Sequence, residues 1–251
     1  MIEYYGLSDV GLHRANNQDS YLTIFNSDGD FLAIVCDGIG GAKAGDVASK
    51  TVVDYFKDHF GNSSFNSLEE ANNYILHELK MANSEVYALS ISNPNYSGMG
   101  TTLTGVLITK FGTLSLNAGD SRTYGMLDKK LFHLTKDHTL VNQMIDNGEI
   151  TYDESLTHPK RHYLVKAVGV WNDVVFDVHR VKDMDYYLIC SDGLCGYCSD
   201  DEIVYIMDSL EFDTCEKKAN ELNRLALSKG GYDNTTVIVV KVSWRLLIDM
   251  K

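Results

Sequence analysis

The chain has 251 residues, 44% of them hydrophobic and 23% charged, which is typical of a soluble globular domain with a sizeable core. Its formal net charge is -13, so the phosphates of a nucleic acid would be repelled and nucleic-acid binding is disfavoured. The N-terminus lacks the pattern of a signal peptide, no apolar run could span a bilayer, and the 5 cysteines have no disulfide spacing, which predicts a reduced, cytoplasmic protein that does not bind membranes.

The first half of the chain predicts strands followed by two helices. Asp28-Gly29 is a hairpin signal between two apolar runs, so the strands on either side of it should pair antiparallel. Apolar residues spaced by three or four run from Leu68 to Leu89 and predict a long amphipathic helix that stops before Pro94. The expected elements are strands at 2–10, 20–26 and 31–36, a helix at 44–60 and the helix that begins at Leu68.

The second half predicts a return to strands, then a long polar segment, then two more helices. Residues 138–170 have little predicted structure apart from a short helix at about 139–147, and such a segment in a compact domain is often a functional loop. The other expected elements are strands at 101–109, 113–118, 121–127, 131–134, 174–181, 186–190 and 235–243, and helices at 200–210 and 214–228.

Hairpin-like turns dominate this order of elements, so the sheets should be mainly antiparallel. About ten strands exceed what one open sheet easily holds, which favours two packed sheets with helices outside them. No repeat or proline-rich linker divides the chain. Residues 1–251 are therefore expected to form one α+β domain, a four-layer α-β-β-α sandwich with two central sheets between pairs of helices.

Four aspartates stand at the ends of predicted central strands. Asp37 and Asp192 each follow an apolar run and precede glycine. Asp120 follows another such run, and Asp233 comes just before the last one. Clustered carboxylates withdrawn from water repel one another, and divalent cations remove that cost; oxygen ligands suit Mg²⁺ or Mn²⁺. A single Asp-Gly pair is usually a turn, but the set of four predicts one metal site built from distant segments.

The glycine-rich segment after Cys36 also has the strand, glycine and helix order of a phosphate-binding loop. Its details do not fit a nucleotide. Lys43 stands where the dinucleotide pattern needs a third glycine, and Asp46 follows Gly45 where a P-loop has lysine. A carboxylate there would repel phosphate, so nucleotide binding is disfavoured.

Seven short motifs occur in register along nearly the whole chain. They are Gly11-Leu12-His13-Arg14-Ala15-Asn16-Asn17-Gln18-Asp19, Cys36-Asp37-Gly38-Ile39-Gly40-Gly41 through Gly45, Gly100-Thr101-Thr102, Gly119-Asp120-Ser121-Arg122, Leu134-Thr135-Lys136-Asp137-His138, Ser191-Asp192-Gly193-Leu194 and Gly231-Tyr232-Asp233-Asn234-Thr235-Thr236. In this order they resemble the metal-dependent protein phosphatase family, type 2C. One motif alone would be weak, whereas the series is highly specific, and the fold of that family agrees with the layers expected above.

The resemblance implies metal ligands at the matching positions. Asp37 matches the carboxylate that bridges two ions, and the Gly38 carbonyl matches a ligand of the second ion. Asp192 and Asp233 match the remaining ligands of the first ion. Asp120 matches the residue that, together with Asp192, holds a third and weaker ion in bacterial members. The implied cofactors are two Mn²⁺ or Mg²⁺ ions, with a third at Asp120.

The resemblance also implies residues that support the ligands and bind the substrate. Arg14 matches the guanidinium that binds the substrate phosphate, a role suited to its fork of donors. Asp19 matches an acid that lies behind the metal ligands and supports them. The resemblance implies that Asn234 supports the ligands in the same way. Gln18 stands where many members have glutamate, and because an amide carries no charge we expect somewhat weaker metal binding.

The implied activity is hydrolysis of phosphoserine and phosphothreonine in proteins by a water that bridges two metal ions, without a phosphoenzyme. No cysteine has an arginine six positions on, so the sequence contains no Cys-x5-Arg phosphate loop. The implied partners are phosphorylated proteins, among them a Ser/Thr kinase that the enzyme would oppose and that kinase's substrates. The size of the chain resembles stand-alone bacterial members, and a monomer is expected.

Ile39 departs from those members that carry a histidine there as the acid that protonates the leaving group, so the proton donor stays open. This departure motivates one alternative, a non-catalytic member that binds phosphoproteins without hydrolysing them. The complete set of four aspartates argues against it, because degenerate members usually lose a ligand.

Cys195 and Cys198 have redox-motif spacing without the matching fold context, so packing is favoured over a redox or zinc role.

Overall fold

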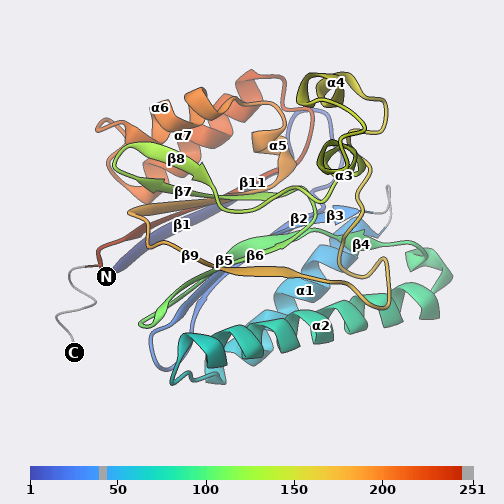
Figure 1. Cartoon of the computed structure of the whole chain (residues 1–251), viewed down its shortest axis with the longest axis horizontal. Coiled ribbons are helices and arrows are strands. Elements are labelled where there is room, and N and C mark those ends of the chain that lie inside the picture. Colours follow the sequence, from blue (N-terminus) through green and yellow to red (C-terminus); the bar gives the residue numbers. More distant parts are fainter. Residues whose placement is uncertain (40–43, 245–251) are drawn as a thin grey trace.

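The computed structural model of the protein describes residues 1–39 and 44–244. Two β-sheets pack face to face and helices cover the outer face of each, so the molecule has four layers (Figure 1). All strand pairs in the described residues are antiparallel. The predicted α+β sandwich of two mainly antiparallel sheets between helical layers is therefore confirmed.

The strands divide between the two sheets in a way that mixes the ends of the chain. In spatial order, the first sheet contains β1 (Ile2–Asp9), β11 (Thr235–Val242), β10 (Tyr186–Cys190), β7 (Arg122–Leu127) and β8 (Lys130–His133). The second contains β2 (Asp19–Phe25), β3 (Phe31–Ile39), β5 (Leu103–Thr109), β6 (Gly112–Ala118) and β9 (Asp177–Val181), with the short β4 (Gly100–Thr101) beside the end of β3.

The helices cover the sheets in two groups (Figure 1). The second sheet is covered by α1 (Gly45–His59) and α2 (Leu68–Ser92), and the first by α5 (Asp192–Cys195), α6 (Asp200–Asp208) and α7 (Cys215–Ser228). The remaining helical elements are α3 (Leu140–Asp146), α4 (Tyr152–Thr157) and the short 3-10 turns η2 (Phe60–Asn62) and η3 (Pro94–Tyr96).

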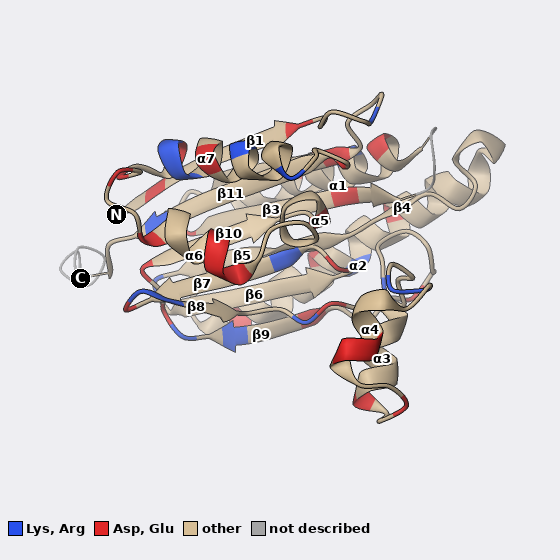
Figure 2. Cartoon of the chain, turned by 90° about the horizontal axis from the view of Figure 1, so that it is seen from above, with Lys and Arg blue, Asp and Glu red and all other residues tan. Residues whose placement is uncertain are grey.

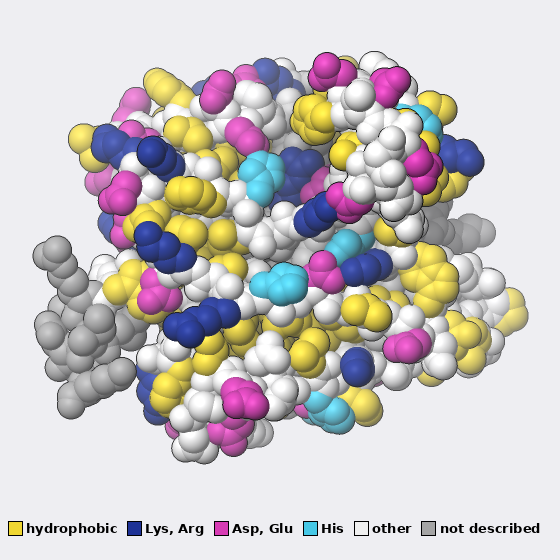
Figure 3. Space-filling view, viewed as in Figure 1, with side chains coloured by type: hydrophobic (Ala, Val, Ile, Leu, Met, Phe, Trp, Pro, Cys, Tyr) yellow, Lys and Arg dark blue, Asp and Glu magenta, His cyan; other side chains and the backbone are white. Residues whose placement is uncertain are grey.

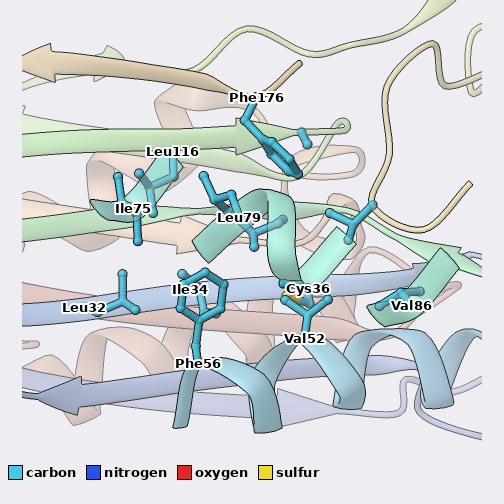
Figure 4. Packing of buried hydrophobic residues seen from close by; sticks show 14 of the residues in the cluster. Leu32, Ile34, Cys36, Val52, Phe56, Ile75, Leu79, Val86, Leu116 and Phe176 are labelled. Atoms are coloured by element: carbon cyan, nitrogen blue, oxygen red, sulfur yellow. The ribbon is translucent and has the colours of Figure 1, made fainter. Parts of the chain in front are cut away.

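The two faces of β3 belong to different cores, and this fixes where the strand delivers Asp37. Even-numbered residues from Leu32 to Cys36 pack against α1 and α2 (Figure 4). Odd-numbered residues from Phe31 to Val35 pack between the two sheets. Each fully buried large apolar side chain stabilises the fold by about 1.5–3 kcal/mol. Because side chains alternate along a strand, Asp37 is the next position on the inter-sheet side, where the apolar filling ends.

Two predicted strands near the cleft have the wrong limits. The strand expected at 31–36 continues to Ile39, so Asp37 lies inside β3 and not beyond its end. The single strand expected at 101–109 is interrupted at Thr102. The reason is a change of register, because β4 pairs with the last residues of β3 while β5 pairs with β3 only as far as Val35.

The segment 138–170 contains more regular structure than expected. The short predicted helix is present as α3, but a second helix, α4, was not predicted. Thr151 and Glu154 form a capping box at its start, a Thr-x-x-Glu signal that the sequence carries. Both helices project from one end of the sandwich (Figure 2). The strand expected at 174–181 begins only at Asp177.

Three other features considered in the sequence were its apolar runs, its cysteines and its glycine-rich segment. No helix within 1–39 and 44–244 combines the length and the apolar character needed to cross a membrane. All five cysteines are free thiols. Cys198 is buried in the core under α6 and α7, and Cys195 packs against that core, as the packing interpretation predicts. Gly40, Gly41 and Lys43 of the glycine-rich segment lie outside the described residues.

Candidate active site

A cleft of about 450 Å³ is lined by the end of β3, the start of α5 and the segment that follows α4. Its walls come from segments that are far apart in the sequence. All the predicted site residues except Asp19 line it. These lining residues are Arg14, Gln18, Asp37, Gly38, Asp120, Asp192, Asp233 and Asn234.

The interrupted strand near Thr102 fixes the backbone of Asp37. The Asp37 carbonyl accepts hydrogen bonds from the Thr102 N–H at 2.8 Å and from the Thr101 hydroxyl at 2.9 Å. The Asp37 N–H in turn donates to Thr102 Oγ1 at 3.0 Å. At the next residue, a Cβ added to Gly38 would lie 2.2 Å from the Gly45 carbonyl oxygen, so only glycine lets β3 pack against the start of α1. The backbone that carries the Asp37 carboxylate is thus fixed by the two threonines and by the close packing at Gly38.

The carboxyl groups of Asp37 and Asp192 both lie at the wall of this cleft and perturb each other's ionisation. Withdrawal from water, followed by the charges of Asp19 and Asp192, raises the pKa of Asp37 well above its usual value. Withdrawal from water, followed by the charge of Asp233, also raises the pKa of Asp192. Oδ1 of Asp192 finds no donor among the described residues. The ionised form of both carboxyl groups is therefore disfavoured unless positive charge is supplied nearby.

Two further aspartates share this shortage of positive charge. Asp19 lies behind the cleft, directly opposite Asp37 in the pairing of β2 with β3. It accepts a hydrogen bond from the Ser191 hydroxyl at 2.7 Å, yet burial still raises its pKa to about 7. Asp120 lies between β6 and β7 at the wall of the cleft. Burial, with the charge of Asp192, raises the pKa of Asp120 to about 8.

The turn that carries Asp120 is held by the buried His138. The Gly119 N–H donates to Nδ1 of His138 at 3.1 Å, and the His138 N–H donates to the Gly119 carbonyl at 2.9 Å. Because Nδ1 accepts, the proton of the neutral ring is on Nε2, which lies 2.9 Å from Asp177. Lys166 donates to the same carboxylate at 2.8 Å. Burial lowers the pKa of His138 and keeps it neutral. Figure 3 shows histidine, basic and acidic side chains gathered between the helical layers on this face.

Arg14 and Asn234 connect the N-terminal loop to the strand end that carries Asp233. The Arg14 guanidinium donates to Asp233 Oδ2 at 2.7 Å and remains half exposed. Asn234 donates through its backbone N–H to Asp233 Oδ1 at 2.8 Å. The Asn234 side chain accepts from the Gln18 N–H and donates to the Asn16 carbonyl. Asn234 therefore fixes the loop that presents Arg14 and Gln18 to the cleft.

The donor set fits hard divalent cations. The side chains and the Gly38 carbonyl offer oxygen only, Asp192 Oδ1 has no donor, and the raised carboxyl pKa values indicate unbalanced negative charge. No three acidic, histidine or cysteine side chains in the described part of the chain are already arranged as a metal cage. Arg14 pairs with Asp233, so a cation bound to that carboxylate oxygen would have to replace this interaction.

The raised pKa values predict how the stability of the metal-free protein depends on pH. A carboxyl group with a higher pKa in the folded chain binds more protons when folded, so its stabilising contribution is complete near pH 4 and is lost as the pH rises through the folded pKa. For Asp19 and Asp120 that loss falls between about pH 4 and the folded values of about 7 and 8. We expect the melting temperature in chelator to fall by several degrees between pH 5.5 and pH 8.5, measured by thermal unfolding. The fall should be smaller in Asp120→Asn; an unchanged or rising melting temperature would contradict the prediction.

The cleft also contains residues for which no role was predicted. Thr102 belongs to a Gly-Thr-Thr motif, and that motif was its signal. His162 and Trp171 come from the polar part of the chain around 138–170, where no periodicity indicates which side chains face inward. Ile39 and His162 both line the cleft.

Comparisons with known proteins agree on one family. A family model described as Protein phosphatase 2C matches residues 13–234. The serine/threonine phosphatase stp of Listeria monocytogenes is 34% identical over 237 residues, which cover 93% of this chain and 93% of that protein. The serine/threonine protein phosphatase PstP of Mycobacterium tuberculosis is 35% identical over 247 residues, which cover 96% of this chain and 45% of that protein. The crystal structure of the serine/threonine phosphatase Stp1 from Staphylococcus aureus is similar with a TM-score of 0.90 and 34% identity, over 97% of this chain and 96% of that one.

Proposed function

Because the chain belongs to the protein phosphatase 2C family, we propose that it hydrolyses phosphoserine and phosphothreonine in proteins in a reaction that depends on Mn²⁺ or Mg²⁺. Its substrates would be proteins phosphorylated by a Ser/Thr kinase, which the phosphatase would oppose in the cytoplasm as a monomer. The observation that carries this proposal is the meeting of four aspartates and Arg14 in one cleft. None of these five residues lies near another in the sequence.

The aspartates divide naturally between the proposed ions. Asp37 would bridge two of them with the Gly38 carbonyl on the second, Asp192 and Asp233 would complete the first, and Asp120 would hold a third with Asp192. When bound, the ions supply a nucleophile at neutral pH and neutralise charge on the phosphate oxygens. The buried, partnerless oxygen of Asp192 and the raised pKa of Asp37 support this assignment, because both groups are short of positive charge.

The protein groups around the ions position the reactants. The Arg14 side chain is half exposed, and one of its guanidinium nitrogens donates to Asp233. The other N–H groups of the guanidinium can donate to a phosphate. Thr101 and Thr102 prevent the backbone of Asp37 from shifting when charge builds up next to it. Asn234 holds the loop of Arg14 against the strand end that carries Asp233. Such preorganised groups stabilise a transition state without rearranging during the reaction.

One observation favours a second candidate function, a phosphoprotein-binding member without catalytic activity. Ile39 lines the cleft at the position where some members carry a proton donor, and an isoleucine cannot protonate a leaving alkoxide. The retained aspartates weigh against this second function, since a pure binding module has no use for a charged metal centre.

The test is turnover of a phosphothreonine peptide with Mn²⁺, in chelator, and after the chelator is saturated with excess Mn²⁺. We expect phosphate release with Mn²⁺, no measurable release in chelator, and recovery on adding metal back. Release that survives full chelation would contradict the proposed function. Tight binding of the peptide with Mn²⁺ and no phosphate release would identify the non-catalytic alternative.

A further inference from the structure

One rim of the cleft, next to Arg14 and Asp233, carries three aromatic rings. His13 and Tyr232 are stacked, with ring centroids 4.9 Å apart and planes 17° apart. The Tyr197 ring lies next to Tyr232, with ring centroids 5.7 Å apart and planes tilted by 35°. Tyr197 and Tyr232 are 41% and 53% exposed, so much of their apolar surface faces solvent. We call His13, Tyr197 and Tyr232 the aromatic shelf.

The shelf is built by the fold from three distant segments and is held in place before any substrate arrives. Gly230 and Gly231 both have positive φ, at 122° and 56°, and so turn the chain tightly ahead of Tyr232. The Tyr232 ring lies on the Gly230 backbone, where an added Cβ would approach it to 2.2 Å. The Leu12 N–H donates to the Gly231 carbonyl at 2.8 Å, which ties the His13 loop to this turn. A ligand would therefore meet rings that lose little further freedom on binding.

The position of the shelf places it beside the phosphate site. His13 directly precedes Arg14, and Tyr232 directly precedes Asp233, so two shelf residues are chain neighbours of cleft residues. The Tyr197 hydroxyl is close enough to the cleft that, after burial, the charges of its aspartates raise the pKa of this tyrosine. One extended residue spans roughly 3.5 Å. A peptide whose phosphate is bound at Arg14 thus carries its neighbouring residues onto the rim where the rings lie.

We propose that the aromatic shelf selects substrates by binding an aromatic or large apolar side chain next to the phosphorylated residue. This inference rests on the proposed function and adds a substrate preference to it. Exposed tyrosine faces favour contact with another ring or an aliphatic chain, and the neighbouring Leu12, 68% exposed, extends the apolar surface.

The preference can be measured with matched phosphothreonine peptides that carry phenylalanine or glycine on both sides of the phosphorylated residue. With Mn²⁺ present, we expect kcat/KM for the phenylalanine peptide to exceed that for the glycine peptide by about fivefold, as one aromatic contact supplies. The double variant Tyr197→Ala/Tyr232→Ala should lose this preference and keep its turnover of the glycine peptide. Tyr205→Ala is the matched control, because Tyr205 is 72% exposed on α6 and does not line the cleft.

The outcomes separate the shelf from the phosphatase activity itself. Equal kcat/KM for the two peptides in the unaltered protein would overturn the shelf while leaving the proposed function intact. A preference that persists in the double variant would overturn it as well. No turnover of either peptide would contradict the proposed function instead. Should the double variant fail to fold, the same kcat/KM ratio is measured for the single variants Tyr197→Leu and Tyr232→Leu. Each removes an aromatic ring and keeps a side chain of similar bulk, so a reduced preference in these variants would support the shelf and an unchanged preference would overturn it.

Discussion

Replacing Asp37 with asparagine is expected to abolish phosphopeptide hydrolysis and, at the same time, to stabilise the metal-free protein. The Asp37 carboxylate is the proposed bridge between two ions, and a neutral amide cannot hold both. Turnover should fall by roughly 10³-fold or more, as when a group that stabilises transition-state charge is removed. The measurement is phosphate release from a phosphothreonine peptide with Mn²⁺.

The expected gain in stability comes from the same electrostatics. Burial and the charges of Asp19 and Asp192 raise the pKa of Asp37, so its ionised form is disfavoured in the folded protein. An amide relieves that repulsion at neutral pH. In chelator, the variant should therefore melt several degrees above the unaltered protein. Added Mn²⁺ should raise the melting temperature of the unaltered protein much more than that of the variant, because ligands stabilise only the state that binds them.

Asp54→Asn provides the control for both measurements. Asp54 is half exposed on α1 and pairs with Lys50 in a surface ion pair, so its loss should change neither turnover nor the response to Mn²⁺. An Asp37→Asn protein that retains activity would refute the assignment of Asp37. A variant that gains as much stability from Mn²⁺ as the unaltered protein would refute it independently of activity.

Replacing Arg14 with alanine should reduce kcat/KM for phosphopeptides by about 10²-fold or more, because a charge-assisted contact to the phosphate is lost. Arg14→Lys should recover only part of this loss, since an ammonium group lacks the planar fork of two donors. Metal binding should be retained in both variants. Mn²⁺-dependent thermal stabilisation measures that property separately from turnover.

A second effect of the Arg14 variants follows from the ion pair with Asp233. This pair joins Arg14 and Asp233 at 2.7 Å, so removing the guanidinium frees an oxygen of a proposed metal ligand. Arg14→Ala should therefore bind Mn²⁺ at least as tightly as the unaltered protein while it turns over less substrate. Arg224→Ala is the matched control, because Arg224 is 72% exposed on α7 and pairs only locally with Glu221. Weaker Mn²⁺ binding in Arg14→Ala would show that Arg14 organises the metal site and would contradict a role confined to phosphate.

Much of the fold could be predicted because its signals are local. The alternation of β3, the spacing of apolar residues from Leu68 to Leu89 and the hairpin at Asp28-Gly29 each depend on residues close together in the chain. The break at Thr102 could not be predicted in this way. It exists because β3 changes its pairing partner beyond Val35, and the local pattern of 101–109 contains no sign of that partner.

The candidate site divides in the same manner. Strand patterns and motif order were sufficient to predict that four aspartates meet in one site. Those four residues line one cleft in the structure: Asp37, Asp120, Asp192 and Asp233. Asp19 was expected behind the metal ligands, and it lies behind the cleft, where it accepts a hydrogen bond from Ser191.

The sequence by itself determined the layers, the family resemblance and the identity of the acidic residues, because strand periodicity and short motifs are properties of neighbouring residues. Only the tertiary structure decided what surrounds those acids. The approach of Asp37 to Asp192, the Arg14–Asp233 ion pair and the shelf of His13, Tyr197 and Tyr232 each bring together segments that are widely separated along the chain. Their distances, burial and charge depend on how two sheets meet, and no pattern confined to one segment specifies that meeting.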